Sequence, residues 1–172
     1  MTSSKSLAKK IAPDYASVTR AVDKIHDQFR ITEPPVDPVA IARNLGVKVH
    51  FVSFKKEGSG ISGFYDADDN AIYVNSDEFP LRQTFTVAHE LGHKVLHEDW
   101  AKSTSYKMLL RNSSEQSNDP YEREANAFAA HLLVPRFMLD LYWRKNTLED
   151  LSRLFAVSVP VIQNRIAFEY GA

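Results

Sequence analysis

In the first third of the chain, the spacing of apolar residues predicts two helices followed by a strand. Over residues 14–29 they recur at steps of three and four, which describes one face of a helix. A second, short helix is predicted after Asp37, whose side chain suits an N-cap, with Pro38 in the first turn and Gly46 at its end. Residues 47–54 are rich in Val and Phe and predict a strand.

Two further strands are predicted over residues 61–65 and 71–75, because the polar run DADDN at 66–70 between them is typical of a turn. A longer helix is expected to begin near Pro80 and to continue to about His97. Helices together with a small antiparallel or mixed sheet indicate the α+β class.

The second half of the chain is predicted to be helical apart from one loop. Residues 98–120 are polar and predict a mobile loop. Pro120 opens a helix that ends before Pro135. Two short helices follow, from Thr147 to about Ala156 and from Val159 to about Tyr170, and their tight connection resembles a helix-turn-helix.

Length and composition bound the organisation and the chemistry. A chain of 172 residues buries one good core, so we expect one domain over residues 1–135 with a helical extension, residues 136–172, packed on it. The net charge of −1 favours neither nucleic acid nor an anionic membrane. The chain has no cysteine, so a transition metal would need His, Asp or Glu ligands.

Nothing in the sequence predicts passage through a membrane. No apolar run approaches the length of a membrane-spanning helix. The basic amino terminus, MTSSKSLAKKIAPD, lacks the apolar stretch of a secretory signal. We therefore expect a cytoplasmic protein.

The stretch TFTVAHELGHKVLH, residues 84–97, contains three of the six histidines. His89 and His93 lie one helical turn apart, so both imidazoles can converge on one ion about 2.0–2.1 Å from each nitrogen. Glu90 lies on the adjacent flank, where it can reach a water molecule instead of the ion. This His-Glu-x-x-His pattern predicts a zinc site in which Glu90 is the catalytic base.

Angular positions on this helix separate its three histidines. With His89 at zero, His93 lies at about 40° and Glu90 at about 100°, so the histidines border the buried face and Glu90 points toward a cleft. His97 lies about 80° round and about 12 Å along the axis, so one ion cannot bind all three, and we expect His97 to be structural or at the cleft edge. The predicted buried face consists of Leu81, Phe85, Ala88, Gly92, Val95 and Leu96.

The third ligand is expected from the helix YEREANAFAAHLLVP, residues 121–135. Glu122 and Glu124 lie about 200° apart on it, so only one can face the ion. Glu122 adjoins the apolar side, whereas Glu124 is predicted to be a solvated charge on the outer face. Asn126, one turn from Glu122, is expected to hydrogen-bond a ligand histidine. The predicted buried side is Ala125, Phe128, Ala129, Leu132 and Leu133, and the remaining histidines, His26, His50 and His131, are expected to be surface or packing residues.

These blocks resemble the ImmA/IrrE family of zinc metallopeptidases. The resemblance rests on residues 84–97, on GISGFYDADDNAIYVN at 60–75 and on residues 121–135, and IARNLGVKV at 41–49 and the helical tail fit the same layout. It implies a zincin-like core, one zinc ion per chain held by His89, His93 and Glu122, and Asn126 in a supporting role. It also implies a protein substrate, typically a helix-turn-helix repressor whose cleavage relieves silencing in a mobile element, a toxin–antitoxin-like module or a stress response.

Other segments of the chain are candidates for contact with a substrate. The hairpin formed by residues 61–65 and 71–75 could offer an edge strand to an extended substrate, and loop 98–120 could gate access. Candidates for contact with the substrate or its oxyanion are His97, Tyr106 and Tyr121.

Two other readings compete with a peptidase. One is a zinc-bearing regulator that binds its repressor without cutting it. The other is a DNA-binding protein that uses the two C-terminal helices. Residues 134–172 carry five Lys/Arg against four Asp/Glu, which is not the basic excess of a duplex-binding face, so we expect no direct contact with nucleic acid.

Overall fold

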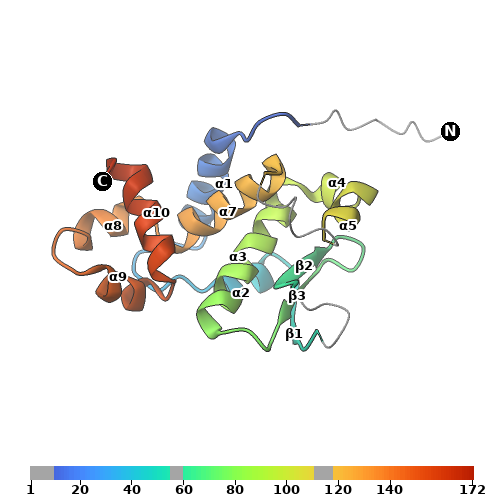
Figure 1. The fold of residues 1–172 in the computed structure, drawn as a ribbon, viewed down its shortest axis with the longest axis horizontal. Helices are drawn as coiled ribbons and strands as arrows, with labels where there is room; N and C mark the ends of the chain where they lie inside the picture. Colours follow the sequence, from blue (N-terminus) through green and yellow to red (C-terminus); the bar gives the residue numbers. More distant parts are fainter. Residues whose placement is uncertain (1–9, 55–59, 111–117) are drawn as a thin grey trace.

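The computed structural model describes residues 10–54, 60–110 and 118–172, and the side chains of 108–110 are not included. The turn expected at 55–59, the first nine residues of the amino terminus and residues 111–117 of the expected loop lie outside this part of the chain. The structure is α+β, as predicted (Figure 1). Its elements are α1 (Tyr15–Gln28), α2 (Pro38–Asn44), β1 (Lys48–Val52), β2 (Gly63–Asp66), β3 (Ala71–Asn75), α3 (Pro80–Leu96), α4 (Glu98–Ala101), α5 (Thr104–Leu110), α7 (Pro120–Leu133), α8 (Arg136–Tyr142), α9 (Leu148–Phe155) and α10 (Val159–Tyr170).

The three strands form one mixed sheet in the order β1-β3-β2. The parallel pair aligns Val49 of β1 with Ile72 of β3. The antiparallel pair aligns Phe64 of β2 with Tyr73 of β3, so the predicted hairpin is confirmed. β2 is an edge strand. Gly63 lies so close to α3 and β3 that a Cβ there would meet Thr86 Cγ2 at 2.5 Å and the carbonyl oxygen of Tyr73 at 2.6 Å.

Helix α3 occupies the centre of the molecule, between the sheet and α7, with α1 on the far side of α7 (Figure 1). A Cβ at Gly92 would lie 3.1 Å from the ring of Phe128 on α7, which explains glycine in mid-helix at this crossing. The expected apolar face is wrong at its two ends, because Leu81 and Val95 are 40% and 38% exposed. Both lie next to the ends of α3, whereas Val87 and Leu91 are fully buried in its middle, where the sheet covers the other flank.

Local sequence rules account for several helix ends. The carboxylate of Asp37 accepts from the backbone N–H groups of Val39 and Ala40 at the start of α2. The helix ends before Gly46, whose φ of +80° is left-handed. Asp119, followed by Pro120, caps α7 in the same way, through the N–H groups of Tyr121 and Glu122. These caps begin α2 and α7 where the sequence predicts.

Residues 98–101 and 104–110 are helical, although the sequence predicts a loop there. α4 and α5 are short, and they are held by burial of Trp100, Ala101 and Tyr106 rather than by intrinsic helical periodicity. The ring of Trp100 stacks on Tyr121 of α7, with centroids 4.3 Å apart. Long-range packing therefore organises a segment whose local sequence reads as a loop.

The C-terminal helices lie at the opposite end of α3 and α7 from the sheet (Figure 1). α9 and α10 were predicted, whereas α8 was not. Arg165 of α10 is buried: its Nε donates to the carbonyl of Val134 at 3.0 Å and its Nη2 pairs with Glu169 at 2.6 Å. No helix among the described residues is long and apolar enough to cross a membrane.

Candidate metal centre

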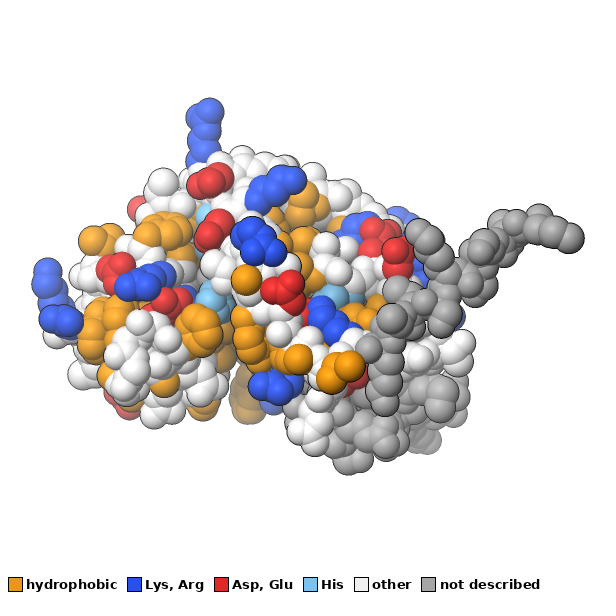
Figure 2. Space-filling view, turned by 90° about the horizontal axis from the view of Figure 1, so that it is seen from above, with side chains coloured by type: hydrophobic (Ala, Val, Ile, Leu, Met, Phe, Trp, Pro, Cys, Tyr) orange, Lys and Arg blue, Asp and Glu red, His pale blue; other side chains and the backbone are white. Residues whose placement is uncertain are grey.

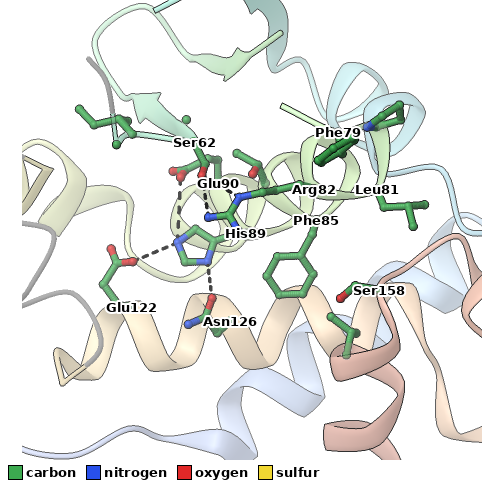
Figure 3. Close-up of a pocket in the computed structure, with 16 residues that line it drawn as sticks. Ser62, Phe79, Leu81, Arg82, Phe85, His89, Glu90, Glu122, Asn126 and Ser158 are labelled. Atoms are coloured by element: carbon green, nitrogen blue, oxygen red, sulfur yellow. Dashed lines mark hydrogen bonds and ion pairs between the residues drawn. The ribbon is translucent and has the colours of Figure 1, made fainter. Parts of the chain in front are cut away.

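Helices α3 and α7 bring His89, His93 and Glu122 together at their crossing. His89 Nε2 lies 3.1 Å from Glu122 Oε2, His93 Nε2 lies 3.1 Å from Glu122 Oε1, and the two imidazole nitrogens are 3.2 Å apart. In Figure 3, Glu122 reaches from α7 toward the ring of His89 on α3. Within the described part of the chain, no other group of three His, Asp or Glu side chains comes this close together.

The donor set fits a divalent ion of the zinc type. Ligands about 2.0–2.1 Å from a tetrahedral ion lie roughly 3.3–3.4 Å from one another, close to the observed 3.1 and 3.2 Å. Two imidazoles and one carboxylate form the set that catalytic zinc sites use when a fourth position serves water or substrate. His89, His93 and Glu122 would therefore hold such an ion.

Electrostatics at this crossing favour a cation. Burial raises the pKa of Glu122, but its hydrogen bonds to His89 and His93 outweigh burial and hold that pKa well below its ordinary value. Burial lowers the pKa of His89, but the hydrogen bond to Glu122 and the charges of Glu90 and Glu122 raise it to about 9. The ionised carboxylate holds positive charge on His89, charge that a metal ion would supply instead.

Asn126 orients His89 from one turn along α7. Its Oδ1 lies 2.9 Å from His89 Nδ1, and Figure 3 shows the amide below the ring. Because the amide oxygen accepts, His89 Nδ1 donates, and Nε2, the nitrogen that faces Glu122, is the one that would bind an ion. The side chain occupies the place that the helical geometry of the sequence predicts for it.

Glu90 lies beside the three ligands rather than among them. Its Oε1 is 4.0 Å from His89 Nε2, and burial raises the pKa of the carboxyl. The hydroxyl of Tyr106 donates to Glu90 Oε2 at 3.3 Å and accepts from the backbone N–H of Tyr65 at 2.8 Å. α5 and the edge strand β2 thus hold the carboxyl group in place.

A cleft of about 940 Å³ opens beside this group. His89, Glu90, Glu122 and Asn126 line one end. In Figure 3 the other end is bounded by Phe85 of α3 and by Ser158 at the start of α10. The remaining lining residues are Gly60, Ile61, Ser62, Gly63, Phe79, Pro80, Leu81, Arg82, Thr86 and Val161. Sequence reasoning missed the wall contributed by Ser158 and Val161, because no local pattern shows where the C-terminal helices dock.

The three candidates for substrate or oxyanion contact do not line this cleft. His97 and Tyr121 line a separate depression of about 360 Å³. Tyr106 is buried against Glu90. None of the three side chains is therefore placed to contact a substrate bound in the cleft.

The expectation for Glu124 is wrong, because its side chain is 2% exposed instead of solvated. Its carboxylate accepts from His97 Nε2 at 2.6 Å and pairs with Lys10 Nζ at 2.5 Å, and the backbone N–H of Asp14 also donates to it. The segment before α1 covers the face of α7 that periodicity assigns to solvent, and no local signal in the sequence shows this.

The other histidines are packing or surface residues, as expected. His26 is buried and its Nε2 lies 3.0 Å from the carbonyl of Leu132. His131, expected on the outer face, is half-buried against α10, where its Nε2 lies 3.0 Å from Arg165 Nη1. His50 is exposed and stacks on Tyr73.

Comparison with known proteins assigns the family. A peptidase family model described as the IrrE N-terminal-like domain matches residues 42–167. The chain belongs to the ImmA/IrrE family. It is 30% identical over 143 residues to the uncharacterized immunity region protein 2 of Bacillus phage phi105, a match that covers 80% of this chain and 82% of that protein.

A second sequence relative and one solved structure are also similar to this chain. The radiation response metalloprotease IrrE of Deinococcus deserti is 34% identical over 82 residues, covering 45% of this chain and 27% of that protein. The structure of a Mycobacterium tuberculosis transcriptional regulator matches with a TM-score of 0.62 and 17% identity, over 88% of this chain and 46% of that one. At that identity the likeness concerns the fold alone.

Proposed function

We propose that this chain is a zinc-dependent endopeptidase that cleaves a helix-turn-helix transcriptional repressor. The observation that carries the proposal is the convergence of His89, His93 and Glu122 beside an uncoordinated, buried Glu90 at the end of an open cleft. Membership of a peptidase family supports the reaction class. The similarity to an immunity region protein of a phage supports the repressor as substrate. The proposed activity on a transcriptional repressor would take place in the cytoplasm.

In the proposed reaction the chain's own groups position water and substrate. A zinc ion held by the three ligands would supply Lewis acidity, which polarises a carbonyl and makes water nucleophilic near neutral pH. The Glu90 carboxylate accepts the proton of the attacking water and then delivers it to the leaving amine. Tyr106 keeps that carboxylate oriented through its hydroxyl.

The edge of β2 suits an extended peptide. The backbone N–H of Tyr65 points away from β3, toward Tyr106. Because the direction of the backbone N–H and C=O groups repeats every two residues along a strand, those of Gly63 also point away from β3. Gly63 also lines the cleft. A substrate strand could therefore pair with β2 at Gly63 while its side chains meet Phe85 and Val161.

The first prediction tests the base with Glu90→Gln. The amide cannot accept the proton of water, so we expect cleavage of a purified helix-turn-helix repressor that the wild type cuts to fall by about 10²–10⁴-fold while zinc content stays near one per chain. Fragment formation is followed by intact mass spectrometry and zinc by atomic absorption. Glu33→Gln, at an exposed acid between α1 and α2, is the control and should cleave normally. Unchanged cleavage by Glu90→Gln would refute the assignment.

A non-cleaving regulator would behave differently in the same assay. It would form a stable complex with the repressor, and neither the wild type nor Glu90→Gln would yield fragments. The buried, raised-pKa carboxyl of Glu90 beside an open cleft favours the peptidase, because a purely structural ion needs neither a base nor a cleft.

Direct DNA binding is disfavoured by the charges of the C-terminal helices. Of the five basic residues in the segment 134–172, Arg136, Arg153 and Arg165 form ion pairs with acidic neighbours. Arg165, on the helix of recognition length, is 2% exposed. On the face drawn in Figure 2, basic and acidic side chains are interspersed rather than gathered by sign. We therefore propose that α9 and α10 bind protein rather than duplex DNA.

A further inference from the structure

A buried chain of hydrogen bonds lies behind His93, on the side away from the cleft. His93 Nδ1 is 3.1 Å from His97 Nδ1, and His97 Nε2 is 2.6 Å from Glu124 Oε2. His97 and Glu124 are 4% and 2% exposed. Neither lines the cleft, so the proposed reaction makes no direct use of them.

The Glu124 carboxylate at the end of this chain decides which atoms donate in these hydrogen bonds. A carboxylate only accepts, so His97 carries a hydrogen on Nε2 and donates it to Glu124. In a neutral imidazole the other nitrogen is then an acceptor, so the N–H between the two rings belongs to His93 Nδ1. His93 Nε2, which lies 3.1 Å from Glu122 Oε1, is then the nitrogen that would bind the ion.

The carboxylate at the end of this chain is itself held by the segment before α1. The backbone N–H of Asp14 donates to Glu124 Oε1, and Lys10 Nζ lies 2.5 Å from both carboxylate oxygens. The ammonium of Lys10 also lies over the ring of Tyr121, 5.3 Å from its centroid. Three donors on one carboxylate fix its orientation and keep it ionised.

We infer that Glu124, acting through His97 and held by Lys10 and Asp14, is a positioning residue that fixes the His93 tautomer whose Nε2 presents a lone pair to the metal. Asn126 does the same for His89 from the opposite side. Each ligand histidine thus has a protein acceptor on Nδ1, an arrangement that sets ring orientation and raises ligand basicity. The inference rests on the metal site of the proposed function, but not on peptidase activity.

The wild-type protein gives a first test that needs no substitution. With ¹⁵N-labelled histidine and bound zinc, long-range ¹H–¹⁵N spectra should show His93 protonated on Nδ1 and metal-bound through Nε2. Protonation on Nε2, or zinc on Nδ1, would overturn the inference. The zinc-free protein should also keep the hydrogen on Nδ1, so this readout survives even if zinc binding, and with it the proposed function, fails.

Two substitutions of His97 separate positioning from simple packing. His97→Leu keeps an apolar filler but removes both hydrogen bonds, and the zinc dissociation constant from chelator competition should rise by about 10–100-fold. His97→Gln offers an amide oxygen to His93 and an amide N–H to Glu124, so it should recover most of the affinity. Equal affinities for Leu and wild type, or equal losses for Gln and Leu, would contradict the role.

The contribution of the segment before α1 is tested on the full chain by Lys10→Ala. Loss of a partly exposed ion pair should weaken zinc binding by about threefold. Lys24→Ala, at an exposed lysine on α1, is the matched control and should bind zinc as the wild type does. Indistinguishable dissociation constants for the two variants would remove Lys10 from the inference. This arm, like the wild-type spectra, stays informative if His97→Leu does not fold.

Discussion

At the scale of single residues, the candidate centre consists of polar side chains that would be costly to bury alone. Glu90, His93 and Glu122 are 5%, 0% and 7% exposed, and each has a partner of complementary charge or hydrogen-bonding capacity. An unpaired buried charge would cost several kcal/mol. The site is therefore a set of mutually dependent groups, and single substitutions should show that dependence.

Asn126 provides the second prediction. Asn126→Leu removes the acceptor from His89 Nδ1, so the ring loses its preferred tautomer and the zinc dissociation constant should rise by about tenfold. Asn126→Asp keeps an acceptor at the same place and should bind zinc nearly as the wild type does. Competition with a chromophoric chelator measures both constants, and equal constants for all three proteins would exclude an orienting role.

His131 gives the third prediction, a pH dependence of stability. Burial, with the nearby positive charge of Arg165, lowers its pKa from 6.5 to about 4. The unfolded chain therefore binds a proton at higher pH than the folded chain, and stability is full above pH 6.5 and falls as the pH drops toward 4. Between pH 7.5 and 5 this one group should remove about 2 kcal/mol of unfolding free energy.

Urea unfolding at those two pH values measures the effect. His131→Gln keeps an acceptor for Arg165 but does not titrate, so the free-energy difference between pH 7.5 and 5 should shrink by about 2 kcal/mol relative to wild type. The buried His26 titrates in the same direction and remains in both proteins. An identical pH profile in the variant would show that His131 makes no contribution.

At the scale of elements, the crossing of α3 and α7 determines the geometry of the site. Gly92 permits close approach to Phe128, and the ligands on each helix face each other across that contact. α10 is fixed to the far end of α7 by Arg165, which joins Val134, His131 and Glu169. One wall of the cleft therefore depends on a buried ionic contact.

Arg165→Leu is the fourth prediction. It leaves the carboxylate of Glu169 and the carbonyl of Val134 buried without their main donor, so unfolding free energy should fall by about 3 kcal/mol. Arg153→Leu is the matched control, because that arginine is exposed and its pair with Asp150 should be worth less than about 1 kcal/mol. Urea midpoints compare the two, and similar small losses would mean that Arg165 does not secure α10.

At the scale of the whole molecule, an ion would join two long helices that are far apart in the sequence. The ligands lie on α3 and α7, with the described helices α4 and α5 between them in sequence. Binding to the folded chain alone stabilises it by mass action, by about 2.7 kcal/mol at a zinc concentration 100 times the dissociation constant. Metal content should therefore change global stability as well as activity.

Removal of zinc is the fifth prediction. For a chain of this size, a loss of about 2.7 kcal/mol corresponds to a Tm lower by about 5–11 °C. Differential scanning calorimetry with zinc and after exhaustive chelation measures the shift. In Glu122→Gln the shift should largely disappear, because the carboxylate ligand is lost. A wild-type Tm insensitive to zinc would argue against the proposed ligands.

Much of this molecule follows from short-range pattern. Caps at Asp37 and Asp119, the hairpin at β2 and β3, and the pairing of His89 with His93 each depend on neighbours within a few residues in the sequence. Helical geometry also predicts Glu122 and Asn126 as the pair on the side of α7 that faces α3. Backbone geometry fixes such relationships wherever the helix is placed.

Tertiary structure alone decided what covers each helix. Periodicity identifies one buried face, but α7 is buried on two, since α3 lies on one side and the segment with Lys10 and Asp14 on the other. That second contact makes Glu124 a buried partner of His97, and docking of α10 adds Val161 to the cleft. The physical reason is that such contacts join residues at least 27, and in the case of Lys10 more than a hundred, positions apart, so nothing in the local sequence records them.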